Sequence, residues 1–153
     1  MKKMKIVMIL FFVTAIIQEV EAGSIYKRNA QKLMDRFVSV LQHNSFEKSA
    51  KKVVPLMHRS LLNSSGRKLD DDTYRYQFKK AHTNAKNYRY PVKVTRVQKL
   101  RTTGVGYGKT YQKGIEYKLW IAKKKGVRGM PAPLVLFFPN GSTIPKLTYV
   151  GSL

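Results

Sequence analysis

The sequence predicts a single α+β domain, in which N-terminal helices pack on an antiparallel sheet of about four strands. In residues 24–90, the apolar side chains recur at helical spacing. In residues 92–153, they alternate with polar side chains or form short blocks that glycine and proline interrupt. A run of helices followed by a run of strands is typical of an α+β protein with an antiparallel sheet. The length of 153 residues favours one domain.

The helical half contains three predicted helices. The first is predicted from apolar residues that fall on one helical face, namely Leu33, Phe37, Val40 and Leu41. Asn44 and Glu47 have the spacing of a capping box, so a second short helix is expected to begin there. Pro55 either ends that helix or starts another turn, because proline lacks the backbone donor. A third helix is expected after residues 70–72, three aspartates that favour the positive end of a helix dipole.

The pattern of side chains in the second half of the chain predicts four strands. The first runs over residues 92–103 and leads into a glycine-rich bend at 104–108. The second covers residues 115–121, where apolar and polar side chains alternate and so define two faces. The third, residues 134–138, is apolar throughout, which is typical of a central buried strand. The last covers residues 147–150.

Residues 1–22 have the parts of a secretory signal peptide. Lysines near the start precede an almost wholly apolar run over residues 6–17, and Val20 and Ala22 occupy the positions before a cut that take small or modest side chains. We expect cleavage after Ala22 and an exported domain over residues 23–153, periplasmic or secreted. The apolar run is shorter than the ~20 residues of a spanning helix, so the processed chain is not expected to be an integral membrane protein.

The net charge of +22 predicts attraction to polyanions. Removal of residues 1–22 takes away three lysines and two glutamates and leaves +21, so the charge belongs to the domain. Outside the cytoplasm the available polyanions are anionic lipids, lipopolysaccharide and DNA, and binding to them is expected to be electrostatic and tolerant of their identity. The alternative is a solvated lysine-rich surface with non-specific attraction only. The candidate contacts are Lys79, Lys80, Lys123, Lys124, Lys125 and Arg128.

The sequence contains few motifs that indicate catalysis or the binding of a metal or cofactor. The absence of cysteine excludes disulfides, a thiolate nucleophile and cysteine-ligated metals. The scattered histidines lack metal-ligand spacing, and the glycines of 104–108 lack the following helix of a nucleotide loop, so we expect no metal and no cofactor. Mid-strand Glu116 is a candidate acid–base group, with a salt bridge to a lysine as the alternative. The candidate ligand contacts are Glu116, His58, His82 and Tyr117, and no catalytic residue is assigned.

Three segments resemble the nuclear-transport-factor-2-like (cystatin-like) superfamily: residues 44–55 resemble its second helix, and residues 131–141 with 145–151 resemble its final hairpin. The resemblance covers roughly residues 24–153. It implies a cone, in which three helices close over a curved antiparallel sheet with a pocket at the open end. The superfamily includes isomerases, dehydratases and non-catalytic binding modules, and its enzymes use pocket Asp and His residues that cannot be matched here.

The sequence therefore favours an exported, non-enzymatic domain that binds a small apolar ligand or a partner through a cone pocket or a basic surface. A homodimer is compatible with this interpretation. One alternative is a polyanion-binding envelope protein. The other is a small isomerase or hydrolase that uses Glu116 with a histidine. A pocket lined by Glu116 and either His58 or His82 favours the enzyme, whereas an apolar pocket and a one-sided basic face favour binding.

Overall fold

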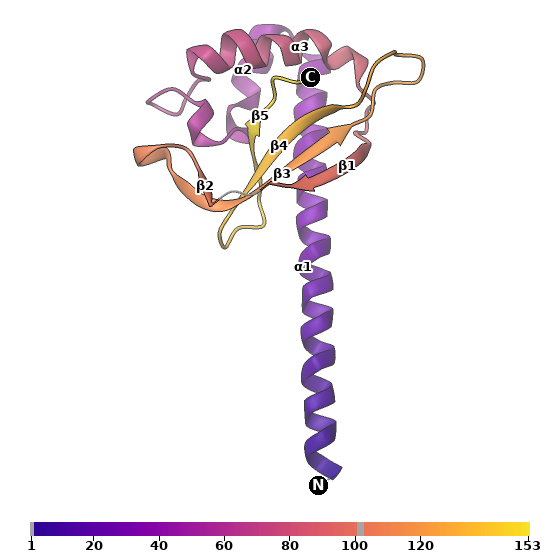
Figure 1. Ribbon diagram of the computed structural model, residues 1–153. Helices are drawn as coiled ribbons and strands as arrows, with labels where there is room; N and C mark the ends of the chain where they lie inside the picture. Colours follow the sequence, from indigo (N-terminus) through magenta and orange to yellow (C-terminus); the bar gives the residue numbers. More distant parts are fainter. Residues whose placement is uncertain (1, 101–102) are drawn as a thin grey trace.

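The computed structural model describes residues 2–100 and 103–153, with side chains from residue 23 onward. It is an α+β fold, as predicted, in which three helices accompany an open antiparallel sheet (Figure 1). The helices are α1 (Lys2–His43), α2 (Phe46–Val53) and α3 (Lys79–Asn84). Within the described residues, no helix combines the length and the apolar run needed to cross a membrane.

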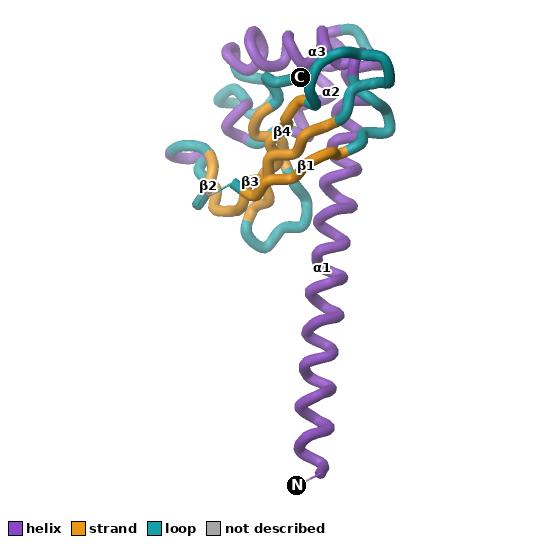
Figure 2. The backbone as a smooth tube through the Cα atoms, turned by 45° about the vertical axis from the view of Figure 1, so that its right-hand side comes forward, coloured by secondary structure: helices purple, strands orange, loops and turns teal. Residues whose placement is uncertain are grey.

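Helix α1 is one continuous helix of 42 residues, so the predicted signal segment and the first helix of the domain form a single element. Its C-terminal half lies against the sheet, and its N-terminal half projects beyond it (Figures 1 and 2). The predicted apolar face is confirmed, because Leu33, Phe37 and Leu41 are buried and Val40 is partly buried against the core. The side chains of the signal segment lie outside the described residues.

The capping box predicted at the start of α2 is wrong. The N-cap is Ser45, and its side chain makes no capping hydrogen bond. The Asn44 amide instead donates to the Val40 carbonyl at 2.9 Å, which satisfies the end of α1. The Glu47 carboxylate accepts a hydrogen bond from the Tyr74 hydroxyl at 2.8 Å. Both side chains predicted to form the capping box therefore bond to neighbouring elements instead.

Two predictions about the remaining helical segments are confirmed. Pro55 ends α2 and lies in the first turn of a 3₁₀ helix, Val54–Leu56. The aspartate run starts the third helical stretch: the Asp70 carboxylate accepts from the Thr73 backbone N–H at 2.9 Å and from its hydroxyl at 2.6 Å. That stretch is π-helical over Thr73–Phe78 and continues into α3.

The sheet has five strands in the described residues, one more than the predicted number: β1 (Val94–Lys99), β2 (Gly104–Val105), β3 (Gln112–Ile121), β4 (Ala132–Pro139) and β5 (Lys146–Tyr149). The main order is β1-β3-β4-β5, all antiparallel, and the short β2 pairs with the start of β3. The predicted first strand was too long. It ends at Lys99, and Arg101 and Thr102 of that prediction lie outside the described residues.

The core lies between the helices and one face of the sheet. Strand β4 is central and buried along most of its length, as predicted. Leu134, Leu136 and Phe138 belong to the main core beneath the helices. Val135 and Phe137 are also buried, but they alternate with the core residues and so face the other side of the sheet. The sheet thus has a helix-covered face and an open face.

Candidate functional site

A cleft of about 890 Å³ lies between α1 and the helix-covered face of the sheet. Its volume is within the usual range for small-molecule sites. Helix α1, strands β1, β3 and β4, and the β4–β5 loop all contribute to it. The lining residues are Gly23, Tyr26, Lys27, Ala30, Gln31, Met34, Val94, Val97, Ile115, Tyr117, Leu119, Phe138, Pro139, Asn140, Gly141 and Ser142.

The floor of the cleft is apolar because alternate residues of β3 point to this face. Ile115, Tyr117 and Leu119 fall at every second position and line the cleft together. The Tyr117 ring meets the Phe138 ring edge-on at 5.9 Å, and Tyr26 of α1 meets the same ring at 5.2 Å. Three aromatic rings from three elements thus form one apolar wall.

Hydrogen bonds hold α1 on the sheet at both sides of the cleft. On the β1 side, the Asp35 carboxylate accepts from the Val92 N–H at 2.7 Å, and the Gln31 amide donates to the Val92 carbonyl at 2.8 Å. On the β4–β5 side, the Asn29 amide donates to the Thr143 carbonyl at 2.9 Å. These hydrogen bonds fix the position of α1 on both sides of the cleft.

The polar groups of the cleft lie among the residues of α1 and of the β4–β5 loop. Among the described residues that line it, Lys27 is the only one charged at neutral pH. Gln31, Asn140 and Ser142 add neutral hydrogen-bonding groups. The lining suits a molecule with a large apolar part and an anionic or polar end, because a lone cation near an apolar cavity attracts negative charge.

The structure separates the four predicted ligand contacts. Tyr117 lines the cleft. Glu116 follows Ile115 on β3, so its side chain lies on the open face. His58 packs edge-on to Phe137 on that same face at 5.1 Å between ring centroids. Glu116 and His58 therefore do not line the cleft: strand alternation places Glu116 on the other side of the sheet, and His58 packs there beside Phe137.

Glu116 does not form the predicted salt bridge to a lysine. Its carboxylate accepts a hydrogen bond from the Thr148 hydroxyl of the neighbouring β5 segment at 2.6 Å. Thr148 also lies 3.4 Å from the Val135 carbonyl oxygen, so it joins three strands. This arrangement links β3, β4 and β5 on the open face and keeps the Glu116 carboxylate out of the cleft.

His58 is only 2% exposed. Its Nδ1 accepts from the Ser60 backbone N–H at 3.1 Å, and Nε2 finds no partner at hydrogen-bonding geometry among the described residues. Burial lowers the pKa of His58 below its usual 6.5; the nearby Gln112 amide and Glu116 carboxylate act in the opposite direction. His58 is therefore a neutral packing residue at neutral pH.

His82 does not line the cleft and has a structural position instead. Its Nε2 lies 3.1 Å from the Asn44 carbonyl oxygen, which links α3 to the end of α1. Its ring packs against those of Phe46 and Phe78, at 5.4 and 6.2 Å. Within the described residues, no group of three or more acidic or histidine side chains is placed to hold a metal ion.

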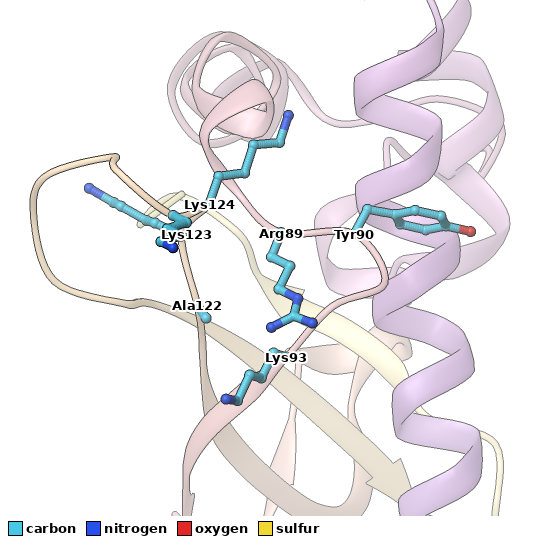
Figure 3. A pocket seen from close by; sticks show the side chains of 7 residues that line it. Arg89, Tyr90, Lys93, Ala122, Lys123 and Lys124 are labelled. Atoms are coloured by element: carbon cyan, nitrogen blue, oxygen red, sulfur yellow. The ribbon is translucent and has the colours of Figure 1, made fainter.

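A second concave site, which we call the basic notch, lies where β1 begins and β3 ends (Figure 3). Its volume is about 420 Å³. Three of the predicted polyanion contacts line it, and two further cations that the sequence did not single out join them. The notch is lined by Arg89, Tyr90, Lys93, Ala122, Lys123, Lys124 and Lys125.

The other predicted polyanion contacts lie outside the notch. Lys79 and Lys80 are exposed at the start of α3, and Arg128 is exposed in the β3–β4 loop. Arg89 and Lys93 were missed because they lie 34 and 30 positions before Lys123, the first residue of the lysine run. The signal that could have found them is the antiparallel pairing of the first and second predicted strands, which places the start of one beside the end of the other.

Comparison with known proteins adds no relative: no family model, curated protein or solved structure matches this chain.

Proposed function

We propose that this chain is an exported, non-enzymatic binding domain of the nuclear-transport-factor-2-like type, which holds a small amphiphile in the α1–sheet cleft. The support for the fold type is the placement of helices over one face of an open antiparallel sheet, with the cleft between them. The ligand has an apolar body and an anionic head. The apolar body lies on the floor of the cleft, and the head lies near Lys27.

The observation that carries this proposal is the amount of apolar surface that the cleft leaves in contact with water. Val97 is 58% exposed although it faces the helix-covered side of the sheet, and Ile115 and Tyr117 beside it are only partly buried. Burying such surface contributes about 25 cal/mol per Å². A ligand with an aliphatic chain or ring system gains this energy, whereas a fully polar ligand does not.

The lining argues for binding without catalysis. The titratable side chains among the described lining residues are Lys27, Tyr26 and Tyr117, with no carboxylate and no imidazole. The isomerase or hydrolase alternative depends on Glu116 with His58 or His82. Glu116 and His58 lie on the open face, and His82 packs against Phe46 and Phe78. Proton transfer requires a group within hydrogen-bond reach of the substrate. The geometry therefore supports the binding protein better than the enzyme.

Export is the second part of the proposal. Cleavage after Ala22 makes Gly23 the first residue, and Gly23 lines the cleft beside Lys27. The new α-ammonium group then adds a second positive charge at the position proposed for the anionic head. Mass spectrometry of the protein from culture medium or periplasm should find Gly23 at its N-terminus. Recovery of the intact chain in those fractions contradicts this part.

The cleft is tested by filling it. A neutral fluorescent naphthylamine dye should bind the protein and be displaced by a long-chain fatty acid. Val97→Trp places a bulky side chain in an exposed part of the floor and should weaken dye binding about tenfold or more. Gln98→Trp is the matched control, because the next residue of β1 faces the open side. Equal dye binding by both variants, with unchanged circular dichroism, contradicts the proposal.

The charge of the ligand is tested with Lys27→Met. Fatty-acid binding should weaken a few-fold, because an exposed ion pair contributes about 1 kcal/mol or less. Binding of the corresponding long-chain alcohol should not change. Lys32→Met is the control, since Lys32 is exposed on the same helix and does not line the cleft. A loss that is the same for acid and alcohol overturns the assignment of the head group.

A further inference from the structure

We infer that the basic notch is a binding site for a phosphate group, separate from the amphiphile cleft. The notch lies on the open face of the sheet, because Ala122 at its base continues the alternation of Lys118 and Trp120 along β3. The cleft lies on the opposite face. The two sites share no lining residue. Their functions can therefore be tested independently.

The backbone of the notch is held by a continuous set of hydrogen bonds. The Arg89 N–H donates to the Ala122 carbonyl at 3.1 Å, and the Ala122 N–H donates to the Lys93 carbonyl at 2.8 Å. The Lys124 N–H donates to the Asn87 carbonyl at 2.8 Å. Arg89 and Lys93 are thus joined to the same residue, and Figure 3 shows their side chains close together. Binding of a ligand here therefore carries no entropic cost of ordering the backbone of the notch.

Helix α1 also holds the segment that carries Arg89 and Lys93. The Gln42 amide donates to the Ala85 and Tyr88 carbonyls at 2.8 and 2.9 Å. The Tyr90 ring packs edge-on to His43 of α1, at 6.3 Å between centroids, and so points away from the Arg89 guanidinium (Figure 3). The segment that carries Arg89 and Lys93 is therefore attached both to the sheet and to the helix.

The cations of the notch differ from others on the open face because most of them have no partner. Farther along β1 and β3, the Arg96 guanidinium and the Lys118 ammonium lie over the Trp120 ring at 4.5 and 5.1 Å. In the notch, Lys123 donates to the Arg128 carbonyl at 3.0 Å. Among the described residues, the side chains of Arg89, Lys93, Lys124 and Lys125 have no ion-pair or hydrogen-bond partner.

A phosphate group fits this arrangement better than a carboxylate. Clustered cations repel one another, and a dianion removes more of that repulsion than a monoanion does. The planar guanidinium of Arg89 can donate two parallel hydrogen bonds to phosphate oxygens, while the lysines add point charges. A concave, braced cluster also distinguishes the notch from the dispersed lysines of α3. The shared chemistry is a phosphate group, either on a soluble molecule or on a lipid.

The experiment uses the full-length chain at about 150 mM salt, where long-range attraction between exposed charges is largely screened. Inorganic phosphate and phenyl phosphate are titrated by calorimetry. Vesicles containing phosphatidic acid are compared with vesicles of equal surface charge in which oleate is the anionic component. We expect phosphate-bearing ligands to bind and the oleate vesicles to bind at least about tenfold more weakly. Binding to the soluble phosphates identifies a soluble ligand, and binding to phosphatidic acid alone identifies a lipid headgroup.

The decisive variants change the same amount of charge at two places. Arg89→Gln with Lys93→Gln should weaken phosphate binding about tenfold or more. Lys79→Gln with Lys80→Gln, on exposed positions of α3, should change it by less than about twofold. Arg89→Lys keeps the charge but removes the planar donors, and should weaken binding several-fold. Equal losses in both double variants, equal binding to oleate vesicles, or no binding to any phosphate-bearing ligand overturns the inference.

Discussion

The two faces of β3 carry opposite chemistry within the same ten residues. Toward the helices, Ile115 and Leu119 contribute to an apolar cleft and core. Toward the open face, Glu116 pairs with a threonine and Lys118 lies over Trp120. A strand with one covered face can therefore carry an apolar site on that face and polar side chains on the other.

The two faces also differ in how they are stabilised. The helix-covered face buries large apolar side chains completely, including Leu134 and Leu136 of β4. The open face depends mainly on pairwise polar and cation–π contacts, although the rings of His58 and Phe137 form a small buried cluster there. Substitutions on the covered face should therefore have larger effects on the free energy of unfolding than those on the open face.

The largest effect is expected for Leu136→Asp. The substitution places a charge without a partner in the main core, and its cost is comparable to the whole stability of about 5–15 kcal/mol for a domain. The variant should lose the cooperative thermal transition seen by circular dichroism. Gln98→Asp on the open face is the control and should shift the unfolding free energy by about 0.5 kcal/mol or less. A native melting curve for Leu136→Asp contradicts the placement of β4.

A smaller effect is expected for Thr148→Val, which removes the hydroxyl that donates to Glu116. A hydrogen bond to a charged group contributes about 1.5–3 kcal/mol, and chemical denaturation should show a loss of this size. Thr95→Val removes the exposed hydroxyl that donates to the Trp120 carbonyl at 3.2 Å and should cost less. If the two losses are equal, the Glu116 contact is not a special feature of the open face.

Arg96→Gln should cost about 0.5–1 kcal/mol, because an exposed cation over an aromatic ring contributes that amount. Tryptophan fluorescence should also change, since Trp120 is the sole tryptophan of the chain and Arg96 lies on its ring. Lys99→Gln removes an exposed positive charge from the same strand and has no ring partner, so it should change neither quantity. An unchanged spectrum for Arg96→Gln would count against the stacked geometry.

The smallest effect is expected from the titration of His58. Because burial lowers its pKa in the folded state, the unfolded chain takes up a proton more readily as the pH falls through 6.5. Stability should therefore be full above pH 6.5 and decrease below it. His58→Asn keeps an acceptor for the Ser60 N–H and should flatten this slope. A slope that persists unchanged in His58→Asn contradicts this assignment.

The spacing of apolar side chains and the residues at helix starts predicted the elements that neighbours along the chain stabilise. The apolar face of α1 and the central strand β4 follow from side-chain period, and the start of the third helical stretch follows from Asp70. The capping box at Asn44 failed because a nearby carbonyl at the end of α1 competes for the same amide. The salt bridge of Glu116 failed because a threonine on β5 is closer than any lysine.

The sequence by itself determined the order of the elements, the sign of the charge and the face that each residue of β3 presents, because these depend on neighbours along the chain. Only the tertiary structure decided that Tyr26 would meet Phe138 in the cleft and that Arg89 and Lys93 would join Lys124 in the notch. These contacts between distant segments depend on strand register and on where α1 crosses the sheet. Register follows from the buried faces of both paired strands and from the turns that join them, so the pattern of one segment taken alone does not contain it.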